Sequence, residues 1–331
     1  MDDKSFRLRK GDGIAIFAPS WPATALTKSR YERGKKFLED KGFTFICGNL
    51  TGKSDIYRSA SIKERADELN SLIRNPEVKC IIAAIGGMNS NSILPYIDYE
   101  AFKNNPKIII GYSDVTAILL GIYAITGITT FYGPAVVPSF GELPPYADET
   151  FKYFGDMFCE EIIFPYTYPT PDLWTDEYLD FETQDRAKIG KKNKLITVHE
   201  GKVIGRIIGG NLNTISGIWG SEYMPKIKEG DILFIEDCNK DISTVERSFS
   251  HLKINGIFDK VAGIILGKHE LFNDLDTGRK PYEVLMEVIG NTSIPILAEF
   301  DCCHTHPMLT MPIGAQIELD ATNKKVTLLK F

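Results

Sequence analysis

The feature of this sequence that most constrains its fold is a buried strand followed at once by a polar turn and a second apolar segment. Residues 108–110 are three isoleucines, and Gly111-Tyr112-Ser113-Asp114 follows them directly. Another apolar run, over residues 117–124, then begins without a turn signal. A short β-branched run bounded by turn residues is typical of a strand that is covered on both faces in a parallel sheet. We therefore predict an α/β fold in which Ser113 stands at a tight strand-to-helix turn.

Two interpretations of this turn are open from the local sequence. Ser113 and Asp114 both have side chains that cap helices, so the turn can be an ordinary cap after a core strand. Alternatively it is a nucleophile elbow, which places a serine hydroxyl beside the free N–H groups of a helix start. The usual elbow pattern Gly-x-Ser-x-Gly is not met, because Val115 occupies the position of the second glycine.

The rest of the first half alternates strands with helices. Strands are predicted over residues 13–20, 43–47 and 78–85, and helices over 27–41 and 61–74, the second of which opens with a capping box at Ser61. This alternation predicts a parallel, Rossmann-like sheet with helices on both faces. Because ligands bind at the carboxyl ends of such strands, we expect the loops at Gly86-Gly87 and at Ser113 to be neighbours.

The alternation breaks near residue 140, where two proline-rich stretches and a polar segment begin. We predict an N-terminal α/β domain over residues 1–150 and a specificity loop region over 165–200. A smaller C-terminal α/β domain is predicted over 200–331. In that domain a strand ending in a tight Gly209-Gly210-Asn211 turn is expected, followed by strands over 231–237, 261–266 and 295–300. A closing hairpin is expected over 316–329.

Composition limits the class of protein. The 331 residues are 43% hydrophobic and 25% charged, with a formal net charge of −6. This charge argues against binding to nucleic-acid polymers or anionic membranes. The sequence has no run long enough to span a bilayer and its first residues lack the apolar core of a signal peptide, so we expect a cytoplasmic protein. The six cysteines form no Cys-x-x-Cys pair, and neither a disulfide framework nor a metal site is predicted.

Three reactive residue types follow predicted strands: Ser113, Glu236 and His304. A serine hydroxyl becomes a nucleophile when a base takes its proton, and a carboxylate orients that base. The alternative for Glu236 is a helix-cap acid in front of residues 242–252. His306 competes with His304 as the base, but the spacing of Cys302-Cys303-His304-Thr305-His306 matches no standard zinc site.

Five motifs together resemble one family. They are Gly86-Gly87 with the downstream Asn-x-Ile-Leu-Pro-Tyr, Gly111-Tyr112-Ser113-Asp114, Gly209-Gly210-Asn211-Leu212, Ile235-Glu236-Asp237, and the run from His304 to Gly314. They occur in the order of the LD-carboxypeptidase and microcin C immunity (MccF-type) family of serine peptidases. The segments 205–222, 235–258 and 267–272 and the long loop with Trp174 resemble the immunity branch more closely. One departure is His306, where relatives often carry Asp.

The resemblance implies hydrolysis of the amide bond in peptidyl- or aminoacyl-nucleotides, such as processed microcin C and aminoacyl sulfamoyl adenylates. Such an activity gives self-immunity or detoxification, a form of antibiotic resistance. Ser113, Glu236 and His304 map onto the family's triad. The resemblance also implies a homodimer that needs no cofactor.

For the reaction that the resemblance implies, the N–H groups of Asp114 and Gly87 are the expected oxyanion donors. Trp174 is the expected platform for the nucleobase, although it can equally be a buried anchor of its loop. Trp219 is expected in the core. Two other functions stay open: a murein LD-carboxypeptidase of cell-wall recycling, and a catalytically inactive binding protein with the same fold.

Overall fold

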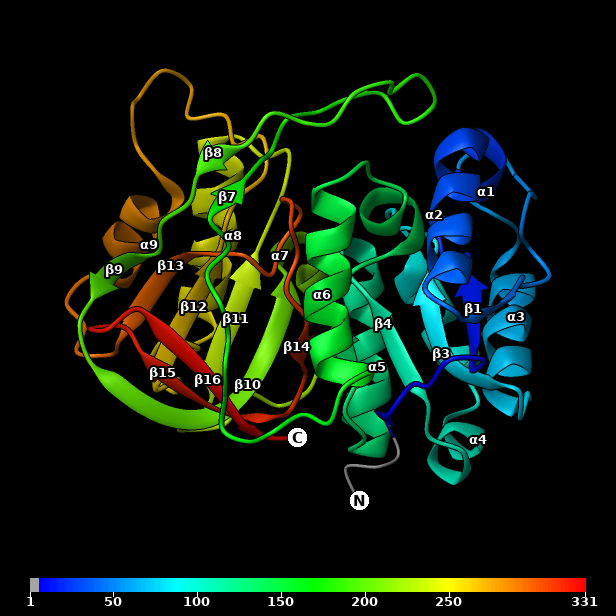
Figure 1. Ribbon diagram of the computed structural model, residues 1–331. Helices are drawn as coiled ribbons and strands as arrows, with labels where there is room; N and C mark the ends of the chain where they lie inside the picture. The colour runs from blue at the N-terminus through cyan, green and yellow to red at the C-terminus, as the bar shows by residue number, and fades with distance from the viewer. Residues whose placement is uncertain (1–5) are drawn as a thin grey trace.

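The computed structural model describes residues 6–331 and contains two large sheets that lie side by side, each flanked by helices (Figure 1). This arrangement confirms the predicted α/β class, with a parallel sheet followed by a second sheet. In spatial order, the strands of the first sheet are β14 (Met311–Pro312), β5 (Phe131–Tyr132), β4 (Ile108–Gly111), β3 (Val78–Ala83), β1 (Gly13–Phe17) and β2 (Thr44–Ile46).

The pairing pattern of the first sheet locates its ligand-binding edge. All its neighbouring strands are parallel except β14, which pairs with β5 in the antiparallel sense. The order β2-β1-β3-β4-β5 is that of a doubly wound sheet, in which the winding direction reverses between β1 and β3. Ligands of such sheets bind in the crevice at the carboxyl ends of the strands on either side of this reversal.

The helices around the first sheet form two packed groups. Helices α3 (Ile62–Arg74), α4 (Tyr99–Asn104) and α5 (Thr116–Thr126) contact one another in sequence. Helix α2 (Lys28–Asp40) contacts α1 (Ala23–Leu26) and the π-helical turn η4 (Val136–Phe140), and η4 contacts α6 (Tyr146–Phe158). The predicted capping box of α3 is confirmed, since Ser61 Oγ accepts the N–H of Glu64 and the Glu64 carboxylate accepts the N–H of Ser61.

The second sheet has a parallel centre and antiparallel edges. In spatial order, its strands are β6 (Tyr166–Thr167), β16 (Lys325–Lys330), β15 (Gln316–Asp320), β10 (Lys202–Asn211), β11 (Ile232–Glu236), β12 (Gly263–Gly267), β13 (Ile296–Phe300) and β9 (Ile196–His199). Strands β10 to β13 are parallel, and β15 with β16 forms the predicted closing hairpin. The helices of this half are α7 (Leu212–Ser216), α8 (Ile242–Ile254) and α9 (Pro281–Ile289).

The predicted turn at Gly209-Gly210-Asn211 is wrong, because β10 continues through Asn211. The two glycines serve close packing instead. Both have positive φ angles, near +148°, and a Cβ on Gly209 would lie 1.6 Å from the carbonyl oxygen of Phe234. A Cβ on Gly210 would lie 2.7 Å from Thr116. Gly209 therefore permits the close packing of β10 against β11, and Gly210 lets the second sheet approach the start of α5.

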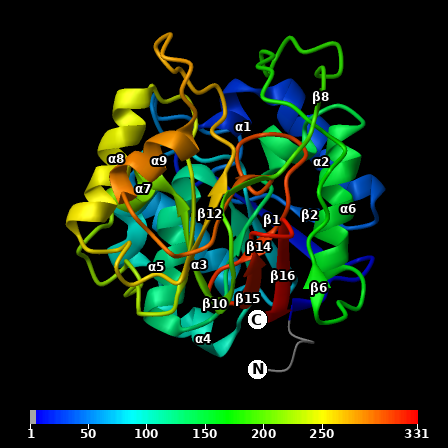
Figure 2. The ribbon, with the colours of Figure 1, turned by 90° about the vertical axis from the view of Figure 1, so that its left-hand side faces the viewer.

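The segment over 165–200 is an ordered connection. It contains β6, β9 and a two-stranded pair, β7 (Leu173–Trp174) with β8 (Lys191–Lys192). Between β7 and β8 the chain extends from the second sheet toward α2 (Figure 1). Figure 2 shows it rising at the same end of the molecule as the loop after β12, while both chain ends lie at the opposite end. The predicted domain limits 1–150, 165–200 and 200–331 stay predictions. Among the helices of residues 6–331, none is long and apolar enough to cross a membrane.

Candidate active site

Ser113 follows β4 in an unusual backbone conformation. Its φ is +62°, a strained value for a residue with a side chain and one suited to a sharp strand-to-helix turn. Residues 113–115 form a 3₁₀ turn, and the residue before α5 is Val115, which has no capping side chain. The predicted helix cap is therefore wrong: the Asp114 carboxylate accepts the N–H groups of Asn89 and Ser90 instead, each at 2.9 Å. The Ser113 hydroxyl faces a pocket and makes no hydrogen bond within residues 6–331.

The loop after β3 lies directly against this turn, as the parallel pairing of β3 with β4 predicts. A Cβ on Gly86 would lie 2.8 Å from Ser113 Cβ, and one on Gly87 would lie 2.2 Å from Ser20 Oγ. Only glycine permits this approach. The N–H groups of Gly87 and Asp114, the predicted oxyanion donors, have no hydrogen-bond acceptor in the described part of the chain. Both N–H groups are therefore unpaired within the described residues, in the two loops that meet at Ser113.

Glu236 ends β11 as a fully buried carboxylate with a complete set of partners. Its Oε2 lies 2.6 Å from His304 Nδ1. Its Oε1 accepts hydrogen bonds from Tyr132 Oη, at 2.5 Å, and from Asn211 Nδ2, at 3.0 Å. Burial raises the pKa of Glu236, but His304 and the other donors lower it further, so the net direction is downward. Glu236 is thus held as an anion, hydrogen-bonded to Nδ1 at the edge of the imidazole.

His304 presents its other nitrogen to the pocket. Its Nε2 is buried and has no hydrogen-bond partner among residues 6–331, and its ring packs edge-on against Tyr112 at 4.8 Å between centroids. Burial disfavours the charged imidazole, but the neighbouring Cys238 and Glu236 side chains outweigh it and raise the pKa of His304 well above its usual range. A base of this kind can accept a proton from a hydroxyl that approaches Nε2.

The three predicted triad residues come together from three strand ends. Ser113 and His304 line one pocket, and Glu236 lies behind His304. Tyr132 Oη links the two halves, because it accepts the N–H of Ser113 at 3.3 Å and donates to Glu236. The structure shows no direct hydrogen bond between Ser113 Oγ and His304 Nε2 in the described chain. In unliganded sites such contacts are often long and shorten when substrate binds.

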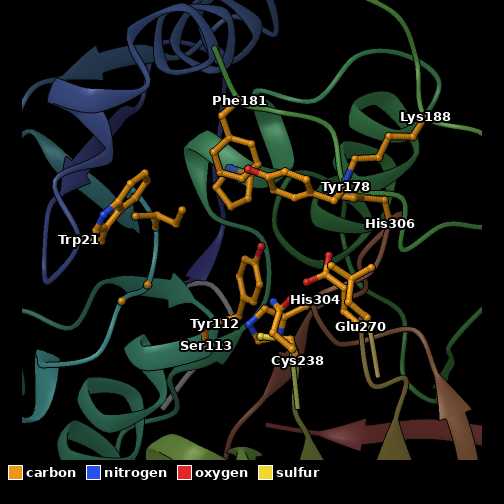
Figure 3. Close-up of a pocket in the computed structure, with 16 residues that line it drawn as sticks. Trp21, Tyr112, Ser113, Tyr178, Phe181, Lys188, Cys238, Glu270, His304 and His306 are labelled. Carbon is orange, nitrogen blue, oxygen red and sulfur yellow. The ribbon is translucent and has the colours of Figure 1, made fainter. Parts of the chain in front are cut away.

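The pocket is a cavity of about 280 Å³ at the carboxyl ends of β1, β3 and β4, the edge at which doubly wound sheets bind ligands (Figure 3). Three aromatic rings, from Trp21, Tyr178 and Phe181, form part of its wall. The full lining is Trp21, Ile85, Gly86, Gly87, Tyr112, Ser113, Pro138, Tyr178, Phe181, Lys188, Cys238, Asn239, Glu270, Leu271, His304 and His306.

Trp174, predicted to bind substrate, lies outside this pocket. Its ring is flanked by Lys191 Nζ at 5.1 Å and Lys268 Nζ at 5.2 Å, and it lines a separate, lysine-rich cavity. Trp174 lies outside the pocket because successive side chains of an extended chain point to opposite sides. Thr175 forms a bridge with His306, with N–H···O distances of 2.9 and 3.0 Å, so Trp174 points to the opposite side. The aromatic residues that reach the pocket come from farther along the same loop.

Buried charges hold that loop in place. Arg30 donates to Glu142 at 2.5 Å and to Gln184 at 2.9 Å, and its guanidinium lies 4.3 Å from the Phe181 ring centroid. The ammonium group of Lys188 lies 3.5 Å from Glu142. Arg30 and Glu142 have no exposed side-chain surface. The loop that carries Tyr178 and Phe181 is therefore fastened to α2 and to the turn after η4.

His306 belongs to this charged cluster, and the neighbouring cysteines belong to the core. His306 Nε2 lies 4.0 Å from Glu142 Oε2, and burial, together with the charges of Lys188 and Arg30, lowers the pKa of His306 well below its usual range. The thiols of Cys302 and Cys303 contact backbone carbonyl oxygens. Among residues 6–331, no group of three His, Cys, Asp or Glu side chains is arranged to hold a metal ion.

Several site residues were not predicted from the sequence. Tyr132 and Asn211 hold Glu236, and Cys238, Glu270 and Phe181 line the pocket. For Tyr132 and Asn211 a signal was present, since each ends a strand at the carboxyl edge where the predicted site lies. Phe181 had no such signal, because which aromatic residue of a long loop reaches a pocket depends on the path of the loop.

Comparisons with known proteins agree with this geometry. Residues 14–133 match the LD-carboxypeptidase N-terminal domain, and residues 204–319 match the LD-carboxypeptidase C-terminal domain. The microcin C7 self-immunity protein MccF of Escherichia coli is 54% identical over 323 residues, which are 97% of this chain and 94% of that protein. A Vibrio cholerae protein whose name places it among the carboxypeptidases is 59% identical over 313 residues, 95% of this chain and 93% of that protein.

Solved structures of MccF superimpose closely on this chain. Complexes of MccF with glutamyl sulfamoyl guanosine and with aspartyl sulfamoyl adenosine both have a TM-score of 0.96 at 54% identity, and the match covers 98% of each chain. The match to the murein tetrapeptide carboxypeptidase of Pseudomonas aeruginosa is weaker, at 23% identity over 244 residues, 72% of this chain and 70% of that protein.

Proposed function

The chain belongs to the LD-carboxypeptidase family of serine peptidases, and we propose that it hydrolyses the amide bond that joins an amino acid or peptide to a nucleotide. Processed microcin C-like toxins and aminoacyl sulfamoyl adenylates are substrates of this class, and their destruction would give self-immunity or detoxification. One observation carries the proposal. The cavity that holds Ser113 beside the Glu236–His304 pair is also walled by the aromatic rings of Trp21, Tyr178 and Phe181, which suit a nucleobase.

In the proposed mechanism, Ser113 Oγ attacks the acyl carbon while His304 Nε2 takes its proton. The same nitrogen then protonates the departing nitrogen of the substrate, and an acyl-serine ester remains. Water, deprotonated by His304, releases the acid and restores Ser113. Glu236 keeps the proton on Nδ1, so that Nε2 stays free to act as the base, and it stabilises the imidazolium that forms.

The oxyanion that forms at the acyl oxygen needs donors that are already oriented. We assign this role to the backbone N–H groups of Asp114 and Gly87, which flank Ser113 and have no acceptor in the described chain. The Asp114 carboxylate helps to fix both loops, because it accepts N–H groups from Asn89 and Ser90 in the loop after β3. These donors therefore require no reorganisation when the charge develops.

For the nucleobase, we propose Phe181 and Tyr178 in place of Trp174. Both rings line the pocket, whereas Trp174 lies between two lysines on the other side of the chain. The Arg30 guanidinium against Phe181 holds that ring at the cavity wall, which lowers the entropic cost of stacking.

A homodimer in the cytoplasm remains part of the proposal on the strength of the family resemblance. Light scattering coupled to size-exclusion chromatography would test the dimer, with a mass near twice that of the 37.1 kDa chain as the expected result. Fractionation of cells that express the protein would test its location.

The proposal is tested by hydrolysis of a substrate panel. Aspartyl and glutamyl sulfamoyl adenosine and a murein tetrapeptide with a terminal D-alanine are each incubated with the protein and with Ser113→Ala, and products are identified by mass spectrometry. We expect the sulfamoyl nucleotides to be cleaved at the amide bond and the Ser113→Ala variant to be inactive. Cleavage of the tetrapeptide alone would establish the second candidate, the murein LD-carboxypeptidase, which the matches to carboxypeptidases support less than the matches to MccF support the nucleotide substrate. A fluorophosphonate that fails to label Ser113 would favour an inactive binding protein.

A further inference from the structure

Cys238 lies in the wall of the catalytic pocket, and the proposed reaction does not use it. It stands two residues after Glu236, is partly exposed, and lines the same cavity as Ser113 and His304. Figure 3 shows its sulfur beside the imidazole of His304. A thiol with access to solvent and a neighbouring base is the usual setting of a reactive cysteine.

Backbone hydrogen bonds fix the position of Cys238 in the wall of the pocket. The N–H of Cys238 donates to Asp237 Oδ1 at 2.9 Å, and Cys238 forms a parallel bridge with Glu270. The next residue, Asn239, donates its N–H to the carbonyl oxygen of Glu270 at 2.8 Å. These bonds tie the end of β11 to the loop after β12.

A second observation concerns His304. Its side chain is only 9% exposed, and its Nε2, which faces this pocket, has no hydrogen-bond partner among residues 6–331. Burial lowers the pKa of His304, but the neighbouring Cys238 and Glu236 side chains raise it more, so that the net shift is upward and the imidazole is a stronger base than usual. The imidazole is therefore placed to take the proton of a thiol as well as that of a serine hydroxyl.

The other cysteines lack this combination. Cys80, Cys302 and Cys303 are buried, and burial raises the pKa of Cys159 to about 11. Cys47 is exposed, but it lies against Tyr31 Oη, at 3.6 Å, and does not line the pocket. Cys47 therefore serves as an internal control, because its thiol is accessible but lies outside the pocket that holds the catalytic base.

We propose that Cys238 is a site of covalent modification by small thiol-directed electrophiles, and that the modification closes the Ser113 pocket. Low-molecular-weight disulfides and thiosulfonates are the chemical class that this site would accept. With methyl methanethiosulfonate, the thiol proton moves to His304 Nε2 and Sγ attacks the methylthio sulfur. A sulfur–sulfur bond forms, the bond between that sulfur and the sulfonyl sulfur breaks, and methanesulfinate leaves with the electron pair. Dithiothreitol reverses the reaction by thiol–disulfide exchange.

The steric consequence follows from the size of the cavity. The cavity has a volume of about 280 Å³, and both Ser113 and His304 line it together with Cys238. A methylthio group on Cys238 would fill space beside His304 Nε2. Reagents that must reach Ser113 would then be excluded, although the triad itself would be unaltered.

The test treats the full-length protein with methyl methanethiosulfonate and then measures fluorophosphonate labelling of Ser113. We expect wild-type labelling to fall by about tenfold or more and to recover with dithiothreitol, because the thiol lies beside the catalytic base. The matched variants are Cys238→Ser, whose remaining labelling should be insensitive to the reagent, and Cys47→Ser, which should behave as wild type. Peptide mapping should locate the modification at Cys238.

Two results would overturn the proposal: modification of Cys47 without Cys238, or modification of Cys238 that leaves Ser113 labelling unchanged. If Cys238→Ser does not fold, Cys238→Ala and the mapping of the wild-type protein still decide the question. A separate readout concerns the base, since His304→Gln should slow iodoacetamide alkylation of Cys238 by about tenfold but leave Cys47 unaffected. These labelling measurements do not depend on any nucleotide substrate, so failure of the proposed function and failure of this inference are distinguishable.

Discussion

Replacing Glu236 with glutamine tests the proposed catalytic unit with the least change in shape. In Glu236→Gln the amide oxygen can still accept the hydrogen bonds of Tyr132 and Asn211. The amide nitrogen must then face His304 Nδ1, where the carboxylate oxygen now lies at 2.6 Å. Because that nitrogen is a donor, Nδ1 has to become the acceptor, and the imidazole proton moves to Nε2. The base is then blocked at the atom that faces the pocket.

The expected loss in kcat is about 10³- to 10⁴-fold, as for the wrong tautomer in other serine triads. It corresponds to about 4–5.5 kcal/mol, since each factor of ten is about 1.36 kcal/mol. The pH profile supplies a second readout. The rate rises with pH as His304 loses its proton, and Glu236 is one of the charges that raise the pKa of His304. The variant's rate should therefore reach a much lower plateau, with its midpoint at a lower pH.

The assay follows hydrolysis of a sulfamoyl nucleotide from pH 5 to 10, with the melting temperature of each variant as the folding control. A loss of less than tenfold in a folded variant would refute the assignment of Glu236 as the residue that orients His304. An unchanged midpoint of the pH profile would refute its electrostatic role.

Other predictions follow from the same contacts. Phe181→Ala should lower kcat/KM for aminoacyl-nucleotide analogues by about one to two orders of magnitude, since stacking on a base is worth about 1–3 kcal/mol; Trp174→Ala should not, and an equal loss in both would contradict the reassignment. His304→Ala should abolish turnover, whereas His306→Ala should cost far less, and a reversed order would show that the wrong histidine was assigned as the base. Glu142→Gln leaves the buried guanidinium beside it without its partner charge, so a loss of about 3–5 kcal/mol in the free energy of unfolding is expected in urea titrations; an unchanged midpoint would mean that this cluster does not stabilise the fold. Turnover should survive prolonged dialysis against EDTA, and recovery on adding zinc after a loss would contradict the serine mechanism.

The sequence alone determined the architecture of this protein and the placement of its candidate reactive residues at strand ends. Isoleucine runs that end in glycine and polar residues specify buried parallel strands, because both faces of such strands must be covered. The same pattern places Gly86, Ser113 and Glu236 at strand ends, where the carboxyl edges of parallel strands converge. Periodicity and turn chemistry act over a few residues, so these features could be predicted without knowing what packs against them.

Only the tertiary structure decided what each side chain contacts. Asp114 has the chemistry of a helix cap, but its carboxylate accepts the N–H groups of Asn89 and Ser90 in the loop after β3. Gly209 and Gly210 have the chemistry of a turn, but Gly209 permits close packing against Phe234 of the neighbouring strand and Gly210 allows the second sheet to approach Thr116 of α5. Trp174 and Phe181 lie in the same loop, yet only Phe181 reaches the pocket. The bridge from Thr175 to His306 and the buried Arg30–Glu142 pair direct the loop's path. These partners are distant in sequence, and contacts of that kind depend on the packed fold rather than on local pattern.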